Sequence, residues 1–175
     1  ISVAGACATA SHGSGDQNSC LSASVSAMKI VTADGELVSF SRQKDEDQLN
    51  GAIVSLGGLG VVTEMTLDLV PAFKVSQFVY NHLPLRQLEQ FSDDIFSSAY
   101  SVSLFTDWKN ESFHQVWLKQ LHTGNTDQVY SKDFYGAQLA TAPSHPIQGI
   151  DAIHCTEQLG VPGPWLDRLP HFRLD

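Results

Sequence analysis

The residues of this chain whose types and spacing could do chemistry lie in the run 4–16, where small side chains surround one histidine, His12. A backbone with so little side-chain bulk lets another molecule approach its amides. Successive N–H groups in such a loop form an anion-binding concavity. The run therefore predicts a phosphate-binding loop, and the alternative interpretation of the same residues is a flexible Gly/Ser linker.

Other catalytic patterns are incomplete in this sequence. The stretch His12-Gly13-Ser14-Gly15 is similar to the oxyanion loop of esterases, but no GxSxG nucleophile elbow accompanies it. The glycines form neither a GxGxxG dinucleotide motif nor a P-loop. The seven histidines show none of the spacings typical of metal ligands, and the close trio His154, Cys155 and Glu157 lies in an irregular segment. We expect no metal site.

Composition indicates a soluble globular protein, because 42% of the 175 residues are hydrophobic and 17% are charged. The net charge of −9 argues against a nucleic-acid partner or an anionic membrane surface, and the ten Lys and Arg residues are scattered. Three cysteines are an odd count without paired spacing, which argues against a disulfide framework. We expect a cytoplasmic protein.

The secondary-structure elements expected to position residues 4–16 follow this run directly in the sequence. Residues 25–32 and 37–40 read as two strands joined by a tight turn at Asp34-Gly35. A helix with apolar residues at helical spacing follows from Asp45 to Leu56 and ends at two glycines. A half-exposed strand at 60–70 then closes at Pro71.

A fresh pattern begins after Pro71, so we place a domain boundary there. Strands are expected at 73–80, 100–105 and 113–119, with a turn at 83–85 and a helix at 85–99. Residues 121–152 read as loop. The tryptophans are expected in the core, with Trp108 and Trp117 packing the second sheet.

Two segments of the first 71 residues carry a family resemblance. SVAG at 2–5 and TASHGSG at 9–15, followed by SLGGLGVVT at 55–63, resemble the flavin-binding domain of the vanillyl-alcohol oxidase family, whose FAD-binding domain is called PCMH-type. The resemblance implies an α+β fold, with residues 1–71 as the second subdomain of the FAD-binding domain and residues 72–175 as the N-terminal part of an antiparallel-sheet substrate domain. It implies FAD as cofactor.

By matching positions, the resemblance assigns a set of FAD contacts, in which one of two adjacent valines takes part. Ala10 stands where glycine is usual in the family, and Ser11 where threonine is usual. His12 is assigned to the cofactor loop in preference to an acid or base role. The cofactor contacts implied are Ser2, Gly5, Thr9, Ala10, Ser11, His12, Gly13, Val61 and Val62.

Within that family, segments from the second half of the chain resemble bacterial alditol (xylitol) oxidases. The matching segments are YSVSLFTDW at 100–108, QVWLK at 115–119, HCTEQLGVPGPW at 154–165 and RLPHFR at 168–173. This implies oxidation of a primary alcohol of a polyol such as xylitol or sorbitol, with hydride transfer to the flavin and reoxidation by O2 to give H2O2. A sugar-1,4-lactone oxidase or dehydrogenase of the same family is the alternative, as is a non-catalytic fragment without flavin.

The chain reads as an internal fragment, because it begins at Ile1 without a methionine. The covalent flavin-binding histidine loop of the family has no counterpart here, and the substrate-binding residues of alditol oxidases are expected beyond Asp175. We therefore assign no catalytic residue. Alone, the fragment is expected to bind FAD weakly, to turn nothing over and to self-associate through exposed apolar surface.

Overall fold

The chain folds into two units, each built of helices and antiparallel strands. The computed structural model describes residues 1–122 and 131–173. Its internal contacts group residues 1–13 and 18–71 into the first unit and residues 14–17 and 72–175 into the second. Both units combine a sheet with helices, so the protein is α+β. The assignment of the units to a flavin subdomain and a substrate domain stays a prediction.

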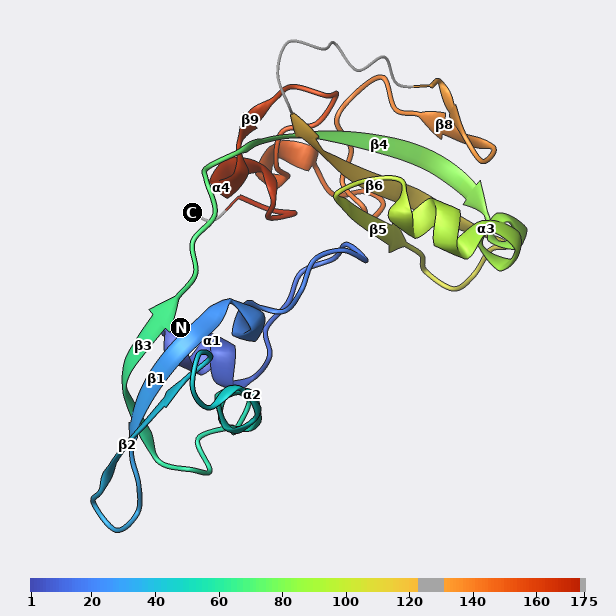
Figure 1. Cartoon of the computed structure of the whole chain (residues 1–175). Coiled ribbons are helices and arrows are strands. Elements are labelled where there is room, and N and C mark those ends of the chain that lie inside the picture. Colours follow the sequence, from blue (N-terminus) through green and yellow to red (C-terminus); the bar gives the residue numbers. More distant parts are fainter. Residues whose placement is uncertain (123–130, 174–175) are drawn as a thin grey trace. The chain divides into compact units, whose positions relative to one another are not determined.

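The first unit is built on a three-stranded antiparallel sheet in the order β2-β1-β3 (Figure 1). Its strands are β1 (Val25–Val31), β2 (Leu37–Ser41) and β3 (Val61–Leu67). Strands β1 and β2 form the predicted hairpin, in which Gly35 supplies the positive φ of 82°.

Three helical segments complete the first unit: α1 (Val3–Ala8), the 3-10 turn η1 (Leu21–Ser24) and α2 (Glu46–Ile53). Helix α2 was expected from its apolar spacing but ends three residues before Leu56, which has a left-handed φ of 52°. The two α-helices and strand β1 share one core, made of Cys7, Val25, Met28, Ile30, Leu49, Ala52 and Ile53.

The second unit contains a six-stranded sheet in which β5-β6-β4-β8-β7 are neighbours and β9 pairs with β4. The strands are β4 (Lys74–Pro84), β5 (Ser101–Phe105), β6 (Ser112–His122), β7 (Asp133–Phe134), β8 (Ala137–Leu139) and β9 (Gly163–Pro164). Its helical segments are α3 (Leu85–Ser97), η2 (Ala152–His154) and α4 (Trp165–Arg168). Among the described residues no helix is long and apolar enough to cross a membrane.

The two faces of the second sheet differ in chemistry. One face is apolar and packs against α3 through Ile95 and Leu88 (Figure 1). On the other face, three rows run across β4, β6 and β5: Gln77, Lys119 and Ser101 in the first, Val79, Trp117 and Ser103 in the second, and Asn81, Gln115 and Phe105 in the third. Residues directly opposite in neighbouring strands project from the same face. This face therefore carries six polar side chains, and four of them, Gln77, Lys119, Ser101 and Gln115, are buried.

Three sequence-based expectations for the second unit were wrong in part. The turn expected at 83–85 is absent, because β4 continues to Pro84 and α3 begins at Leu85. The loop expected at 121–152 includes the end of β6 and the strands β7 and β8, while its residues 123–130 lie outside the described part of the chain. Trp117 is fully buried as expected, but Trp108 is 85% exposed.

Candidate functional site

The first part of the small-residue run is a helix, which corrects the loop interpretation. Ser2 is the N-cap of α1, and its Oγ accepts a hydrogen bond from the Gly5 amide at 3.1 Å. A Cβ at Gly5 would lie 3.1 Å from this Oγ, so glycine leaves the cap undisturbed. Within α1 only Cys7 is buried. The side chain of Cys7 therefore anchors α1 in the core of the first unit.

Helix α1 ends in a Schellman motif. The Ala10 amide donates to the Cys7 carbonyl and the Ser11 amide donates to the Ala6 carbonyl, both at 3.0 Å. Ala10 takes the left-handed position of this motif, with φ of 51°. Glycine suits that position best because it lacks a Cβ. Ala10, which stands where the resembled family usually has glycine, therefore occupies a position with left-handed backbone conformation.

The segment after the helix is exposed and ordered by local bonds. The hydroxyl of Thr9 lies 3.2 Å from the Gly5 and Ala6 carbonyls, and the Ser11 carbonyl accepts from the Leu21 amide at 2.9 Å. His12 Nδ1 lies 3.0 Å from the Gly13 carbonyl. Because a carbonyl can only accept, the proton of a neutral His12 sits on Nδ1 and Nε2 is an acceptor.

The second predicted cofactor segment is a tight turn before β3. Gly57 has φ of 79° and Gly60 has φ of 141°. A Cβ on Gly60 would lie only 2.2 Å from the Val31 carbonyl oxygen, so no other residue fits there. This close approach joins the turn to the end of β1 and fixes where β3 begins.

The structure brings the two predicted segments together. The Leu56 amide donates to the Ala8 carbonyl at 3.3 Å, which joins the turn to the C-terminal end of α1. The two valines that were predicted as alternative cofactor contacts differ in exposure. Val61 is 69% exposed, whereas Val62 packs against the core of the first unit.

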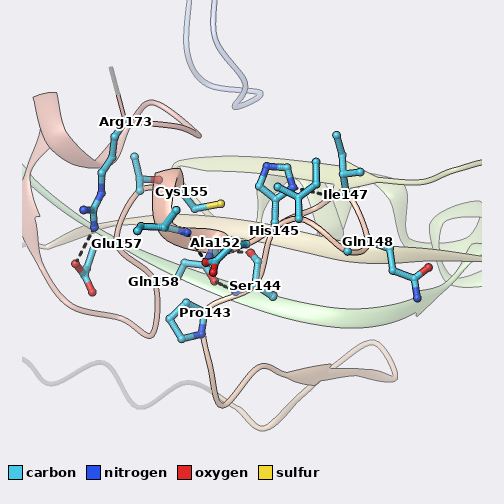
Figure 2. Close-up of a pocket in the computed structure, with 15 residues that line it drawn as sticks. Pro143, Ser144, His145, Ile147, Gln148, Ala152, Cys155, Glu157, Gln158 and Arg173 are labelled. Atoms are coloured by element: carbon cyan, nitrogen blue, oxygen red, sulfur yellow. Dashed lines mark hydrogen bonds and ion pairs between the residues drawn. The ribbon is translucent and has the colours of Figure 1, made fainter. Parts of the chain in front are cut away.

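The second unit holds a cavity of about 770 Å³ on its polar side (Figure 2). Figure 2 shows Gln158 beside Ser144, and its amide pairs with the Ser144 backbone through bonds of 3.0 and 2.9 Å. At one side Arg173 and Glu157 form an ion pair of 3.5 Å. Both side chains are about half exposed, so this pair contributes little stability.

The thiol of Cys155 in this cavity is not an activated nucleophile. Cys155 lines it, but its residue is 2% exposed and burial raises the pKa of the thiol, which keeps the weakly nucleophilic protonated form. In the part of the chain that the structure describes, no three His, Cys, Asp or Glu side chains could hold a metal ion together. The cavity can bind, but its lining does not predict a reaction.

Lys119 is buried beneath residues 168–170, and none of the described carboxylates forms an ion pair with it. Its Nζ donates to the carbonyls of Arg168, Leu169 and Pro170 at 2.6, 2.7 and 2.8 Å. Burial lowers the pKa of Lys119 to about 7, while the three carbonyl oxygens favour the ammonium form. This role was not predictable from the strand expected at 113–119, because a lysine at the end of a strand is usually exposed to solvent.

His171 is the second buried titratable group on this face. Its ring lies across Trp117 with centroids 5.2 Å apart, and its Nε2 is 3.2 Å from the Ser103 hydroxyl. Burial, and next the charge of Lys119, lower the pKa of His171 to about 4. Both side chains therefore connect residues 168–171 to strands β5 and β6 of the sheet.

Comparison with known proteins finds a match that extends along the whole chain. The chain is 50% identical over all 175 residues to an alditol oxidase of Streptomyces sp. (strain IKD472), of which it covers 40%. The chain is therefore similar to one part of this alditol oxidase along its entire length. No family model matches the sequence.

Two further proteins that are similar to this chain are named as enzymes of sugar lactones. An L-gulono-1,4-lactone dehydrogenase of Mycobacterium tuberculosis is 42% identical over 89 residues, which are 51% of this chain and 19% of the relative. A putative D-arabinono-1,4-lactone oxidase of Neurospora crassa is 36% identical over 104 residues, which are 59% of this chain and 19% of the relative. The chain thus spans less than half the length of the relatives it matches. The nine predicted cofactor contacts stay predictions.

Proposed function

We propose that this chain is part of an FAD-dependent oxidoreductase that oxidises a primary alcohol of a polyol such as xylitol or sorbitol. O2 is the proposed acceptor and H2O2 the product. The observation that carries the proposal is the 50% identity to an alditol oxidase over every residue of the chain.

The exposed surface of the first unit has the chemistry that an FAD diphosphate requires. Residues 1–13 contain no Asp or Glu, so this segment has no carboxylate of its own that would repel a phosphate. Their polar groups are backbone amides, the hydroxyls of Ser2, Thr9 and Ser11, and the His12 ring. Most of these residues are exposed, as is the apolar Val61 across the Ala8–Leu56 bond. The donor set therefore fits a bound dinucleotide with both phosphate and apolar parts.

In this proposal FAD, when bound, supplies the redox chemistry by accepting a hydride from the substrate carbon. The chain's own residues bind and orient. The small residues from Gly5 to Gly13 allow the backbone to approach the cofactor closely, and Val61 offers an apolar contact. His12 Nε2 is a hydrogen-bond acceptor toward the open face.

A sugar-1,4-lactone oxidase or dehydrogenase is the second candidate, and the 42% identity to the lactone dehydrogenase over half of the chain favours it. The two candidates are separated by assaying the full-length protein with xylitol, sorbitol and aldonolactones under oxygen. Peroxide formed from a polyol supports the proposal. Turnover of lactones alone, without turnover of any polyol, would replace it by the second candidate.

The third candidate is a stable fragment that binds no flavin. Because the chain covers 40% of the alditol oxidase, we expect it to bind FAD weakly and to be inactive alone. The visible absorbance of the purified chain after incubation with FAD tests this expectation. Tight stoichiometric FAD would contradict it, and a colourless chain that cannot be reconstituted at any FAD concentration would favour the third candidate.

A further inference from the structure

Residues 14–17, which include the end of the small-residue run, belong to the second unit, although the residues on either side of them belong to the first. Gly13 and Ser14 are consecutive, so residues 9–13, the first predicted cofactor segment, end where this short stretch begins. Neither the predicted FAD contacts nor the proposed reaction uses Ser14. The contacts of Ser14 with the second unit decide where the end of that segment is held.

Ser14 docks on the sheet of the second unit through two hydroxyls of β5. Its Oγ is hydrogen-bonded to the Oγ of Ser101 and lies 3.4 Å from the Oγ of Ser103. Ser101 is buried, and Ser14 itself is half-buried. Because Ser101 and Ser103 are two residues apart on one strand, their side chains project from the same face. The strand therefore offers two hydroxyls at fixed positions to a third one.

The hydroxyl of Ser103 is in turn held by His171, whose Nε2 lies 3.2 Å from its Oγ. The ring of His171 packs against two aromatic rings, with its centroid 5.2 Å from that of Trp117 and 5.6 Å from that of Phe105. A hydroxyl donates one hydrogen bond and accepts others, so Ser103 bonds His171 and Ser14 at the same time. The three side chains thus form one chain of hydrogen bonds.

Charge does not hold residues 14–17 in place. Asp16 lines a cavity of about 500 Å³ together with Asp93 and Asp94 of α3, and the charged side chains of this lining are all carboxylates. Like charges repel one another, so these three groups oppose the docking. Uncharged hydrogen bonds, those of Ser14 among them, therefore hold the stretch on the second unit.

We propose that Ser103 and His171 are positioning residues for the predicted cofactor segment. They hold the Ser14 hydroxyl on β5 and thereby fix the backbone of His12 and Gly13, which directly precede it. This role requires no contact of either side chain with substrate or cofactor. The docking of Ser14 is independent of the proposed function, whereas its kinetic consequence rests on that function.

The first test follows the backbone amide signals of the 175-residue chain by NMR, without flavin. Ser103→Ala removes the middle of the chain of hydrogen bonds and is expected to shift the amides of residues 12–14, about 90 positions away in the sequence. Ser103→Thr keeps a hydroxyl at this strand position and should leave these amides near their original positions. The control Ser39→Ala removes the hydroxyl of an exposed strand serine on β2 and should not move them.

The reciprocal variant Ser14→Ala leaves the sequence of β5 intact, so it keeps the test decisive if Ser103→Ala folds poorly. It is expected to shift the amides of Ser101 and Ser103. Unchanged amides of residues 12–14 in a folded Ser103→Ala, or unchanged amides of Ser101 and Ser103 in Ser14→Ala, would overturn the proposal.

The second test measures steady-state oxidation of xylitol by the full-length enzyme. Ser103→Ala is expected to lower kcat by about threefold to tenfold, the equivalent of one uncharged hydrogen bond, because misplacing the cofactor segment affects the alignment for hydride transfer. KM should change by less than about twofold, and Ser103→Thr should recover most of kcat. A raised KM with unchanged kcat would instead assign Ser103 to substrate binding and overturn the proposal. A wild-type enzyme without turnover would count against the proposed function alone, since the NMR test contains neither flavin nor substrate.

Discussion

The backbone amide of Leu56 donates a hydrogen bond to the carbonyl of Ala8 at 3.3 Å. This bond joins the turn before β3 to the end of α1, two segments that are far apart in the sequence and that each carry part of the family resemblance. Val61 follows in the turn's strand with 69% of its surface exposed. The candidate cofactor surface is therefore one continuous part of the first unit.

Gly60 is expected to be irreplaceable in that surface. With φ of 141° and a Cβ position 2.2 Å from the Val31 carbonyl oxygen, Gly60→Ala must displace backbone. We predict a loss of about 2–4 kcal/mol in the free energy of unfolding, measured by urea denaturation. The control Gly51→Ala changes an exposed helical glycine of α2 with open space around it and should stabilise by up to about 1 kcal/mol. Equal effects of the two substitutions would contradict this explanation.

At Ala10, in contrast to Gly60, replacement of alanine by glycine is expected to increase stability. Because its φ of 51° is strained for a residue with a Cβ, Ala10→Gly is predicted to stabilise the first unit by about 0.5–1 kcal/mol. Ala6→Gly, within α1, should instead destabilise by a similar amount. Thermal unfolding of the two variants decides the point, and a lower melting temperature for Ala10→Gly would show that the Schellman motif is not as described.

The lowered pKa of His171 predicts how the free energy of unfolding depends on pH. The unfolded histidine binds a proton near its ordinary pKa of 6.5, whereas the folded side chain, with its pKa lowered to about 4, does not. Between these values the unfolded state holds more protons, so the free energy of unfolding falls as pH falls from about 6.5 to about 4.

Comparing urea denaturation at pH 7 and pH 5 measures this loss. His171→Phe keeps an aromatic ring and should reduce the loss, while His12→Gln, at an exposed position, should not. An unchanged pH dependence in His171→Phe would mean that other groups produce it.

Lys119 is predicted to hold residues 168–170 on the sheet. Lys119→Met keeps most of the side-chain volume but leaves three carbonyls without their donor, which should cost about 2–4 kcal/mol. Hydrogen exchange should accelerate at the Thr156 amide, which donates to the His171 carbonyl. Lys132→Met, at an exposed position, is the control. Unchanged protection of the Thr156 amide in Lys119→Met would contradict the prediction that Lys119 holds residues 168–170 on the sheet.

Elements with strong local signals were predictable from the sequence. Asp34-Gly35 specified the hairpin of β1 and β2, and apolar spacing specified α2 and most of α3. The strand β3 followed from its alternation. In these segments turn chemistry and periodicity agree with the tertiary fold.

Elements without such signals were not predictable. Helix α1 buries only Cys7, so its sequence has no apolar periodicity to read. Strand β6 is covered on both faces, so alternation could not reveal that Lys119 is buried. Trp108 was expected in the core on residue type alone, but it follows β5 in an exposed loop with φ of 59°. Asn81 and Gln115 lie side by side because of the register between β4 and β6, and the sequence pattern does not predict that register.

The central claim is that α1, the His12 segment and the turn before Val61 form one wall of an FAD site. An FAD titration of the 175-residue chain, followed by backbone amide shifts, tests it directly. We predict weak saturable shifts confined to residues 2–13 and 56–62, and their loss in Val61→Glu, which places a carboxylate on the exposed face. Shifts in the second unit alone, or none in the first unit with millimolar FAD, would contradict the account.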